Sequence, residues 1–95
     1  LNSDYKSEAH DSIALILSSL KKYDDALTEY DKLLAMRKIS PYWAVRGRCN
    51  RANLLVKMEK KEEAVKCYKQ ALAVKGYSGW VKKYCIAQLK KCEPK

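Results

Sequence analysis

The sequence predicts an all-α fold of stacked helix pairs, and three observations support this prediction. First, residues 20–36 and 58–74 repeat each other at an offset of 38 residues, with matching acidic, small and aromatic positions. A fixed period of this size is the signature of stacked helical repeats. Second, apolar residues recur at the spacing of helical faces along most of the chain. Third, the chain has two prolines, three glycines and no alternating apolar–polar run, so nothing in it indicates strands.

The first helix pair is predicted within residues 4–38. Its first helix, residues 4–20, has one apolar face, which consists of Tyr5, Ala9, Ile13, Leu17 and Leu20. A short turn leads to the second helix, residues 23–38. Asp24 in its first turn and Lys38 in its last turn suit the helix dipole, because negative charge is favourable at helix N-termini and positive charge at C-termini.

The second helix pair is predicted within residues 40–75. Ser40 can cap the free N–H groups at the start of the third helix, and Pro41 is tolerated in the first turn. This helix extends to about residue 58, and the fourth helix, residues 61–75, repeats the pattern of the second. The chain therefore contains two similar helix–turn–helix units.

A fifth helix is predicted at residues 78–92. Gly76 supplies the left-handed stop that commonly ends a helix, and Ser78 is predicted to cap the new one. Besides its apolar face, this helix has a polar side with Lys82, Lys83, Lys90 and Lys91. A helix pair alone cannot bury its apolar faces, and a solvated final helix covers the last one. We therefore expect a single domain across residues 1–95, with repeats at about 4–38 and 40–75 and a capping helix at about 78–92.

The net charge of +9 is concentrated in the second part of the chain. Residues 1–38 hold six Lys or Arg against seven Asp or Glu, whereas residues 39–95 hold fourteen against four. This asymmetry indicates either an acidic partner for the second part or a lysine-rich surface that only aids solubility. The sequence leaves both interpretations open.

Cysteine usage and hydropathy bear on the compartment. The four cysteines show no Cys-x-x-Cys spacing, and His10 is the single histidine. We expect buried, reduced thiols, with neither a zinc site nor disulfides, and this favours a reducing, cytoplasmic location. Cys49 and Cys67 fall on facing helices of one repeat and are the pair to test for proximity. No apolar run reaches the roughly 18–20 residues that span a bilayer. Because the sequence starts at Leu1 and not at Met, we expect it to be part of a larger chain.

The second helices contain a motif that resembles the tetratricopeptide repeat. The sequence YDDAL at residues 23–27, followed by Tyr30, matches EEAV at residues 62–65, followed by Tyr68. The resemblance covers about residues 7–92, although the units are longer than the usual length of about 34 residues. It implies a right-handed superhelix of two helix–turn–helix repeats plus a C-terminal capping helix.

The resemblance also implies recognition of another protein, as a peptide or a helix, in a concave groove lined by the first helices. On this basis the partner-binding residues are expected to be Asp11, Arg46, Asn50, Asn53, Lys57 and Tyr84. Further groove positions are Glu8, Ser12, Leu15, Ser19, Cys49, Gln88 and Lys91. The groove is expected to be acidic to polar in the first repeat and basic in the second. Asn50-Arg51-Ala52 also resembles a motif of chaperone-binding members that hold a C-terminal carboxylate, but Asp11 would repel an acidic tail.

Nucleic-acid binding is the alternative from another class. Basic residues of the second part, together with Trp43, Trp80 and Tyr84, could combine phosphate contacts with base stacking. This alternative ranks second because Arg46 and Arg48 lie on different faces of their helix and the aromatic residues suit a core. An enzyme is not indicated: no phosphate-binding loop and no acid/base pair occur, so we expect no catalytic residues, no metal and no cofactor.

Overall fold

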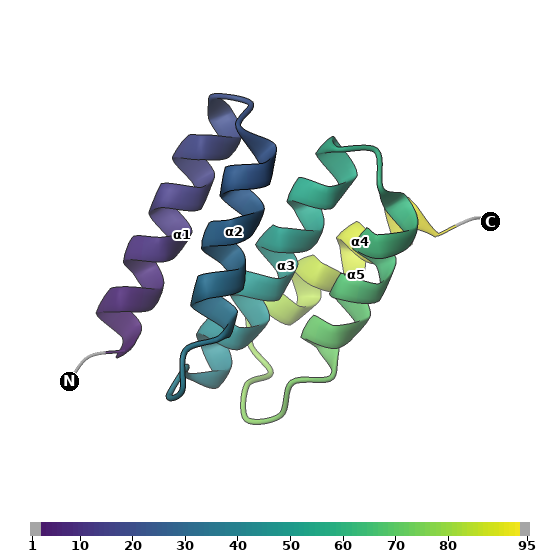
Figure 1. Ribbon diagram of the computed structural model, residues 1–95. Helices are drawn as coiled ribbons and strands as arrows, with labels where there is room; N and C mark the ends of the chain where they lie inside the picture. Colours follow the sequence, from purple (N-terminus) through teal and green to yellow (C-terminus); the bar gives the residue numbers. More distant parts are fainter. Residues whose placement is uncertain (1–2, 94–95) are drawn as a thin grey trace.

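The computed structural model describes residues 3–93, and within this range the chain folds into five α-helices. These are α1 (Ser3–Ser19), α2 (Tyr23–Leu34), α3 (Pro41–Lys57), α4 (Lys61–Leu72) and α5 (Trp80–Cys92). Successive helices run in opposite directions, and tight turns at one end alternate with longer loops at the other (Figure 1). No strand occurs among the described residues. The predicted all-α helical repeat is confirmed.

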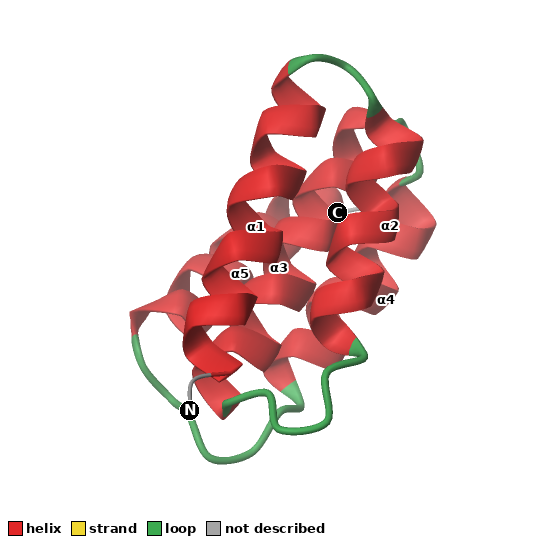
Figure 2. Ribbon diagram, turned by 60° about the vertical axis from the view of Figure 1, so that its left-hand side comes forward, coloured by secondary structure: helices red, strands yellow, loops and turns green. Residues whose placement is uncertain are grey.

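The helices form a slab with extents of 44 × 31 × 18 Å. Within the pairs, α1 packs on α2 and α3 on α4, while α2 also contacts α3 and α4 contacts α5. Because α3 also touches both α1 and α5, the helices α1, α3 and α5 form one layer. Figure 2 shows this layer on one side, with α2 and α4 on the other. One face of the slab therefore consists of the first helices of successive units.

The internal repeat extends into the turns within each pair. Lys21 and Glu59 occupy equivalent positions, and both have a φ of 62°, in the left-handed region that closes many helices. The residue after each of them donates its N–H to a carbonyl of the preceding helix, for example from Lys60 to Leu55 at 2.9 Å. The last carbonyls of α1 and α3 are thus satisfied, and the chain reverses without a glycine.

The predicted cap of α3 is correct, and that of α5 is wrong. Ser40 accepts a hydrogen bond from the backbone N–H of Trp43 at 3.3 Å. Ser78 makes no such bond, and α5 begins two residues later. Instead, the phenol oxygen of Tyr77 accepts the N–H of Val81 at 3.2 Å, so an aromatic side chain from the loop serves the free donor.

The second helices are shorter than predicted. α2 ends at Leu34 and α4 at Leu72, so the remaining residues form the loops that lead to the next unit. Gly76 has a φ of 93°, as expected for a left-handed position, but it lies inside the loop. A Cβ at this position would lie 3.0 Å from Cγ of Pro41. Glycine is therefore favoured there both by the backbone conformation and by the close approach to the start of α3.

Small residues paired with tyrosines build the core. Ala14, Ala26, Ala52 and Ala64 are completely buried, and their small side chains let the helices of each pair approach closely. Tyr30 and Tyr68 are also buried, and each belongs to a different cluster of core side chains. The Tyr30 cluster joins α1, α2 and α3, and the Tyr68 cluster joins α3, α4 and α5. The motif shared by the two units therefore specifies the core.

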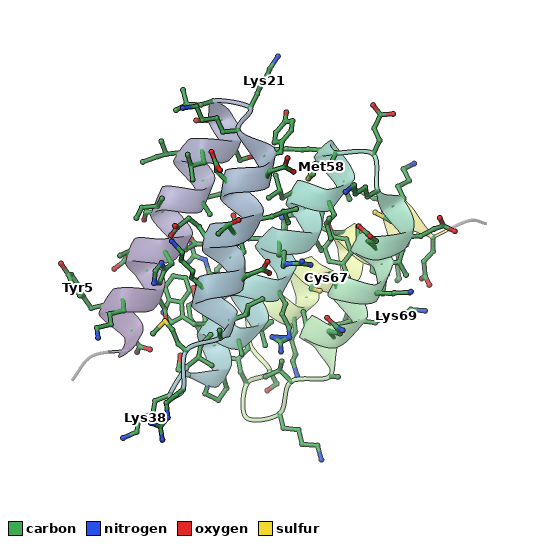
Figure 3. All side chains as sticks on the ribbon, viewed as in Figure 1. Tyr5, Lys21, Lys38, Met58, Cys67 and Lys69 are labelled. Atoms are coloured by element: carbon green, nitrogen blue, oxygen red, sulfur yellow. The ribbon has the colours of Figure 1, made fainter. Side chains whose placement is uncertain are left out.

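The predicted apolar face of α1 is wrong except at Leu17, which packs against the Tyr30 cluster. Tyr5 and Leu20 are 74% and 61% exposed, and Figure 3 shows Tyr5 pointing away from the other helices. The buried positions of α1 are Ser7, Asp11, Ala14 and Ser18. These positions also share one helical face, and Ala14 among them packs with Ala26 and Tyr30 of α2. A close helix contact admits small side chains, so the large apolar ones other than Leu17 lie outside.

The cysteines are free thiols, as predicted. Cys49, Cys67 and Cys85 are buried in the same cluster between α3, α4 and α5, so the pair singled out in the sequence does share one site. Figure 3 shows Cys67 on the inner side of α4. Burial raises the pKa of the Cys67 thiol, which therefore stays protonated at neutral pH. These thiols act as small apolar core residues.

Candidate functional site

The candidate site is a pocket of about 550 Å³ on the face formed by α1, α3 and α5. The start of α4 and two core tyrosines complete it. Its lining residues are Leu15, Ser18, Tyr30, Asn50, Asn53, Leu54, Val56, Lys57, Lys61, Tyr68, Tyr84, Gln88, Lys91 and Cys92. The pocket therefore lies on the side where the concave groove is predicted.

Asn53 is at the centre of a hydrogen-bond network in this pocket. Its side-chain nitrogen donates to the phenol oxygen of Tyr84 at 3.2 Å, and its side-chain oxygen accepts a hydrogen bond from the phenol of Tyr68. Burial raises the pKa of Tyr68, so its hydroxyl remains a donor. The network holds Tyr84 of α5 against α3 while 41% of this residue stays exposed. A partner entering the pocket would meet an oriented phenol.

Three lysines surround the pocket, and among the described residues no Asp or Glu lines it. Lys57 is in the last turn of α3, and its ammonium nitrogen lies 3.4 Å from the hydroxyl oxygen of Ser18. Lys61 is the first residue of α4, where the helix dipole adds partial positive charge. Lys91 is in the last turn of α5. The arrangement favours carboxylates over cations.

Asp11 lies beside the pocket and is 2% exposed. The side-chain nitrogen of Asn50 donates to its Oδ1 at 2.8 Å, and Nη2 of Arg46 lies 3.9 Å from its Oδ2. Burial raises the pKa of Asp11, while the hydrogen bond from Asn50 and the charge of Arg46 oppose this shift. The carboxyl group therefore joins α1 to α3 and does not form an acidic surface in the first repeat.

Arg46 is held by its own helix and by α1. Its Nη1 donates to the phenol oxygen of Tyr42 at 2.7 Å, and its guanidinium carbon lies 4.9 Å from the ring centroid of Trp43. Cation–π contacts of this kind stabilise the charge by about 0.5–1 kcal/mol at exposed sites and by more when desolvated. Trp43 is itself buried, so this ring is not free to stack on a base.

The Asn50-Arg51-Ala52 segment also makes internal contacts. The amide of Asn50 binds Asp11, and Nε of Arg51 donates to Oδ1 of Asp31 on α2 at 2.9 Å. Ala52 is completely buried in the core. The three side chains thus connect α3 to α1, to α2 and to the core, and only Asn50 also lines the pocket.

Four of the six residues predicted to bind a partner line the pocket, namely Asn50, Asn53, Lys57 and Tyr84. Asp11 and Arg46 form a neighbouring cluster. Cys49, predicted to face the groove, is instead in the core and 1% exposed. Lys61 was not predicted, because it belongs to a second helix and only the packing of α4 on α3 brings its start to the pocket. No signal in the sequence marks that proximity.

The described residues show no other chemical centre. Nδ1 of His10 lies 2.9 Å from Oε1 of Glu29 and so links α1 to α2. No group of three or more His, Cys, Asp or Glu side chains within residues 3–93 could hold a metal ion. Over the same range, none of the helices has both the length and the apolar character that crossing a membrane requires.

Comparisons with known proteins agree with the repeat pattern. A family model of the tetratricopeptide repeat matches residues 5–75. The chain is 38% identical over 65 residues to a TPR repeat-containing protein of Methanocaldococcus jannaschii, and this match covers 67% of the chain and 20% of that protein. The chain thus spans about a fifth of this relative's length. No solved structure gives a significant match.

Proposed function

Because the chain belongs to the tetratricopeptide repeat family, whose repeats generally mediate protein–protein interaction, we propose that it binds an acidic segment of another protein in the pocket between α1, α3 and α5. The segment is a short peptide or a helix end with carboxylates and one large apolar side chain. The carboxylates pair with the lysines, and the apolar side chain packs on Leu15 and Tyr84. The family is a non-catalytic scaffold, so we assign no reaction.

The observation that supports this proposal is the charge of the pocket: Lys57, Lys61 and Lys91 line it, and no described carboxylate does. Each exposed lysine–carboxylate pair contributes about 0–1 kcal/mol. Three pairs therefore control orientation and association rate more than affinity. The apolar contact adds to affinity, since Leu15 and Tyr84 are 48% and 41% exposed in the free protein.

The compartment is a part of the same proposal. We place the interaction in a reducing, cytoplasmic environment, and the free state of Cys49, Cys67, Cys85 and Cys92 supports this placement. Nucleic-acid binding through the basic second part is the competing proposal. The burial of Trp43 beneath Arg46 weighs against it, because that ring and that guanidinium are already paired with each other.

The proposal is tested with the double variant Lys57→Glu/Lys91→Glu and three fluorescent probes. The probes are an acidic peptide with one leucine, the same peptide with lysine at every acidic position, and an oligouridine RNA. We expect the acidic peptide to bind best, its affinity to fall at least about tenfold in the double variant, and its binding to weaken with salt. Arg46 is unsuitable for charge reversal because its contacts with Tyr42 and Asp11 stabilise the fold.

Lys66→Glu/Lys75→Glu is the matched control, since it changes the net charge by the same amount and both lysines are exposed and do not line the pocket. We expect this variant to bind the acidic peptide as the unchanged protein does. An equal loss of affinity with this control would show that net charge alone is responsible and would reject the pocket. Stronger binding of the RNA than of the acidic peptide would favour the nucleic-acid alternative.

A further inference from the structure

The outer face of α1 is a stripe of exposed apolar and small side chains: Tyr5, Ala9, Ile13, Ile16 and Leu20. They recur every three or four residues and so share one side of the helix. Ile16 is 59% exposed, and the other large members are exposed as well. Single exposed apolar residues are ordinary, whereas a contiguous stripe marks an interaction site.

The same face of α3 is covered. The residues equivalent to the outer face, at the offset of 38, are Trp43, Gly47, Arg51, Leu54 and Met58. Leu54 and Met58 pack with Tyr30 of α2. Arg51 pairs with Asp31 of α2 at 2.9 Å. The second helix of the first unit therefore covers this face of α3.

The same face of α5 is covered too. Val81, Cys85 and Leu89 are the equivalent residues one repeat further on, and they pack in one cluster with Ala64 and Tyr68 of α4. In both cases within the chain, a second helix of the preceding unit lies on this face of the next first helix. The outer face of α1 differs from them by its exposure and not by its apolar character.

We propose that the outer face of α1 is a docking surface for the second helix of another tetratricopeptide unit, seated on α1 as α2 is seated on α3. The residues specify the chemistry of this helix. Ile13 is in the place of Arg51, so the docked helix has an apolar or small residue where α2 has Asp31. Ala9 is in the place of Gly47, where a Cβ would lie only 2.6 Å from Cδ2 of Leu33, so the docked helix has a side chain smaller than leucine at that position.

A second copy of this domain does not offer the required helix. Its α2 is covered by α3 and its α4 by α5. Lys83 and Lys90 of α5 stand where α3 has Val45 and Ala52, two buried residues in the cluster with α4. Both lysines are exposed, which supports the expected role of α5 as a solvated cap. The proposed partner is therefore a different helical unit.

The test uses a duplicate of residues 3–40 that carries Leu33→Ala, to make room for Ala9, placed directly before Ser3 of the full chain. This insertion puts a copy of α2 at the spacing that separates α2 from α3. We expect amide hydrogen exchange in the original α1 to slow at least about tenfold. We also expect Ile16→Lys in the original α1 to raise the unfolding equilibrium constant at least about tenfold more in the extended chain than in the original one. Ile16→Ala should also raise the unfolding equilibrium constant more in the extended chain than in the original one, but by a smaller factor than Ile16→Lys.

Two further variants sharpen the test. Asp31→Ala in the duplicate should slow the exchange of α1 further, because Ile13 cannot pair with that carboxylate. Ile86→Lys is the matched control, since Ile86 is an isoleucine of α5 with 42% exposure, and its effect should be the same in both chains. Equal effects of Ile16→Lys in both chains would overturn the proposal. A dimer of the original chain that Ile16→Lys dissociates, seen by sedimentation, would overturn it in favour of a second copy.

Discussion

The helices α1 and α3 occupy equivalent positions in their pairs, yet they are buried differently. α3 is buried on two faces, by α4 and by α2, whereas α1 packs chiefly on α2. Ile16 is exposed where α3 has the buried Leu54, and the buried carboxyl of Asp11 is in the place of the Cys49 thiol. The difference shows that the second helices, which repeat closely, build the core, while the residues of the first helices depend on which neighbours surround them.

The largest effect expected from this comparison is that of Leu54→Ala. Leu54 is 2% exposed between α2 and α3, and its truncation should lower the free energy of unfolding by about 2–5 kcal/mol. Ile16→Ala at the equivalent position of α1 should change it by no more than about 0.5 kcal/mol. Urea unfolding of the two variants measures both values. Similar losses would mean that the outer face of α1 is covered in solution.

Overpacking probes what the two units share. Ala26 and Ala64 are equivalent and completely buried, so Ala26→Leu and Ala64→Leu should each destabilise the protein by about 1–3 kcal/mol. Thermal unfolding followed by circular dichroism compares them. If only one of the two substitutions were destabilising, the helix contacts in the two pairs would not be equivalent.

The buried carboxyl of Asp11 predicts that stability depends on pH between pH 3 and 7. The thiol of Cys49, at the equivalent position of α3, contributes no such dependence in this range. Because its pKa is raised in the folded state, the folded protein binds the proton more tightly than the unfolded chain. The contribution of Asp11 to the free energy of unfolding therefore falls as the pH rises from the unfolded pKa of about 3.9 through the folded pKa. Asp11→Asn should remove this fall and change stability at pH 7 by about 1 kcal/mol or less. Denaturant unfolding across pH 3–7 measures the slope, and an unchanged slope would contradict the assignment.

A small effect of the opposite sign is expected in the turns, where the two units have the same backbone conformation. Lys21 and Glu59 have the same left-handed φ of 62°, so Lys21→Gly and Glu59→Gly should each stabilise the protein by about 0.5–1 kcal/mol. The gain is modest because glycine also loses more chain entropy on folding. Chemical denaturation of the two single variants tests whether the gains match. A loss of stability in either would show that the side chain contributes more than the backbone strain removes.

Much of the fold could be predicted from particular residues. The alanine and tyrosine positions of the second helices, the cap at Ser40 and the glycine at residue 76 all have local or periodic causes. Asn53, Lys57 and Tyr84 could be placed on the pocket side because the repeat register assigns them to one face of a first helix. Lys61 could not be placed there, because its proximity to Lys57 results from the packing of two helices and not from spacing along the chain.

The sequence by itself determined that the chain forms helical pairs with a core of small and aromatic residues, because helical periodicity and turn chemistry are local properties. Only the tertiary structure decided which face of α1 is inside. Two stripes share that helix, one large and apolar, the other small and polar with Ser7, Asp11, Ala14 and Ser18. Periodicity and hydropathy favour the first stripe. The close approach of α2 admits only the second, since helices that pack through alanines leave no room for larger side chains.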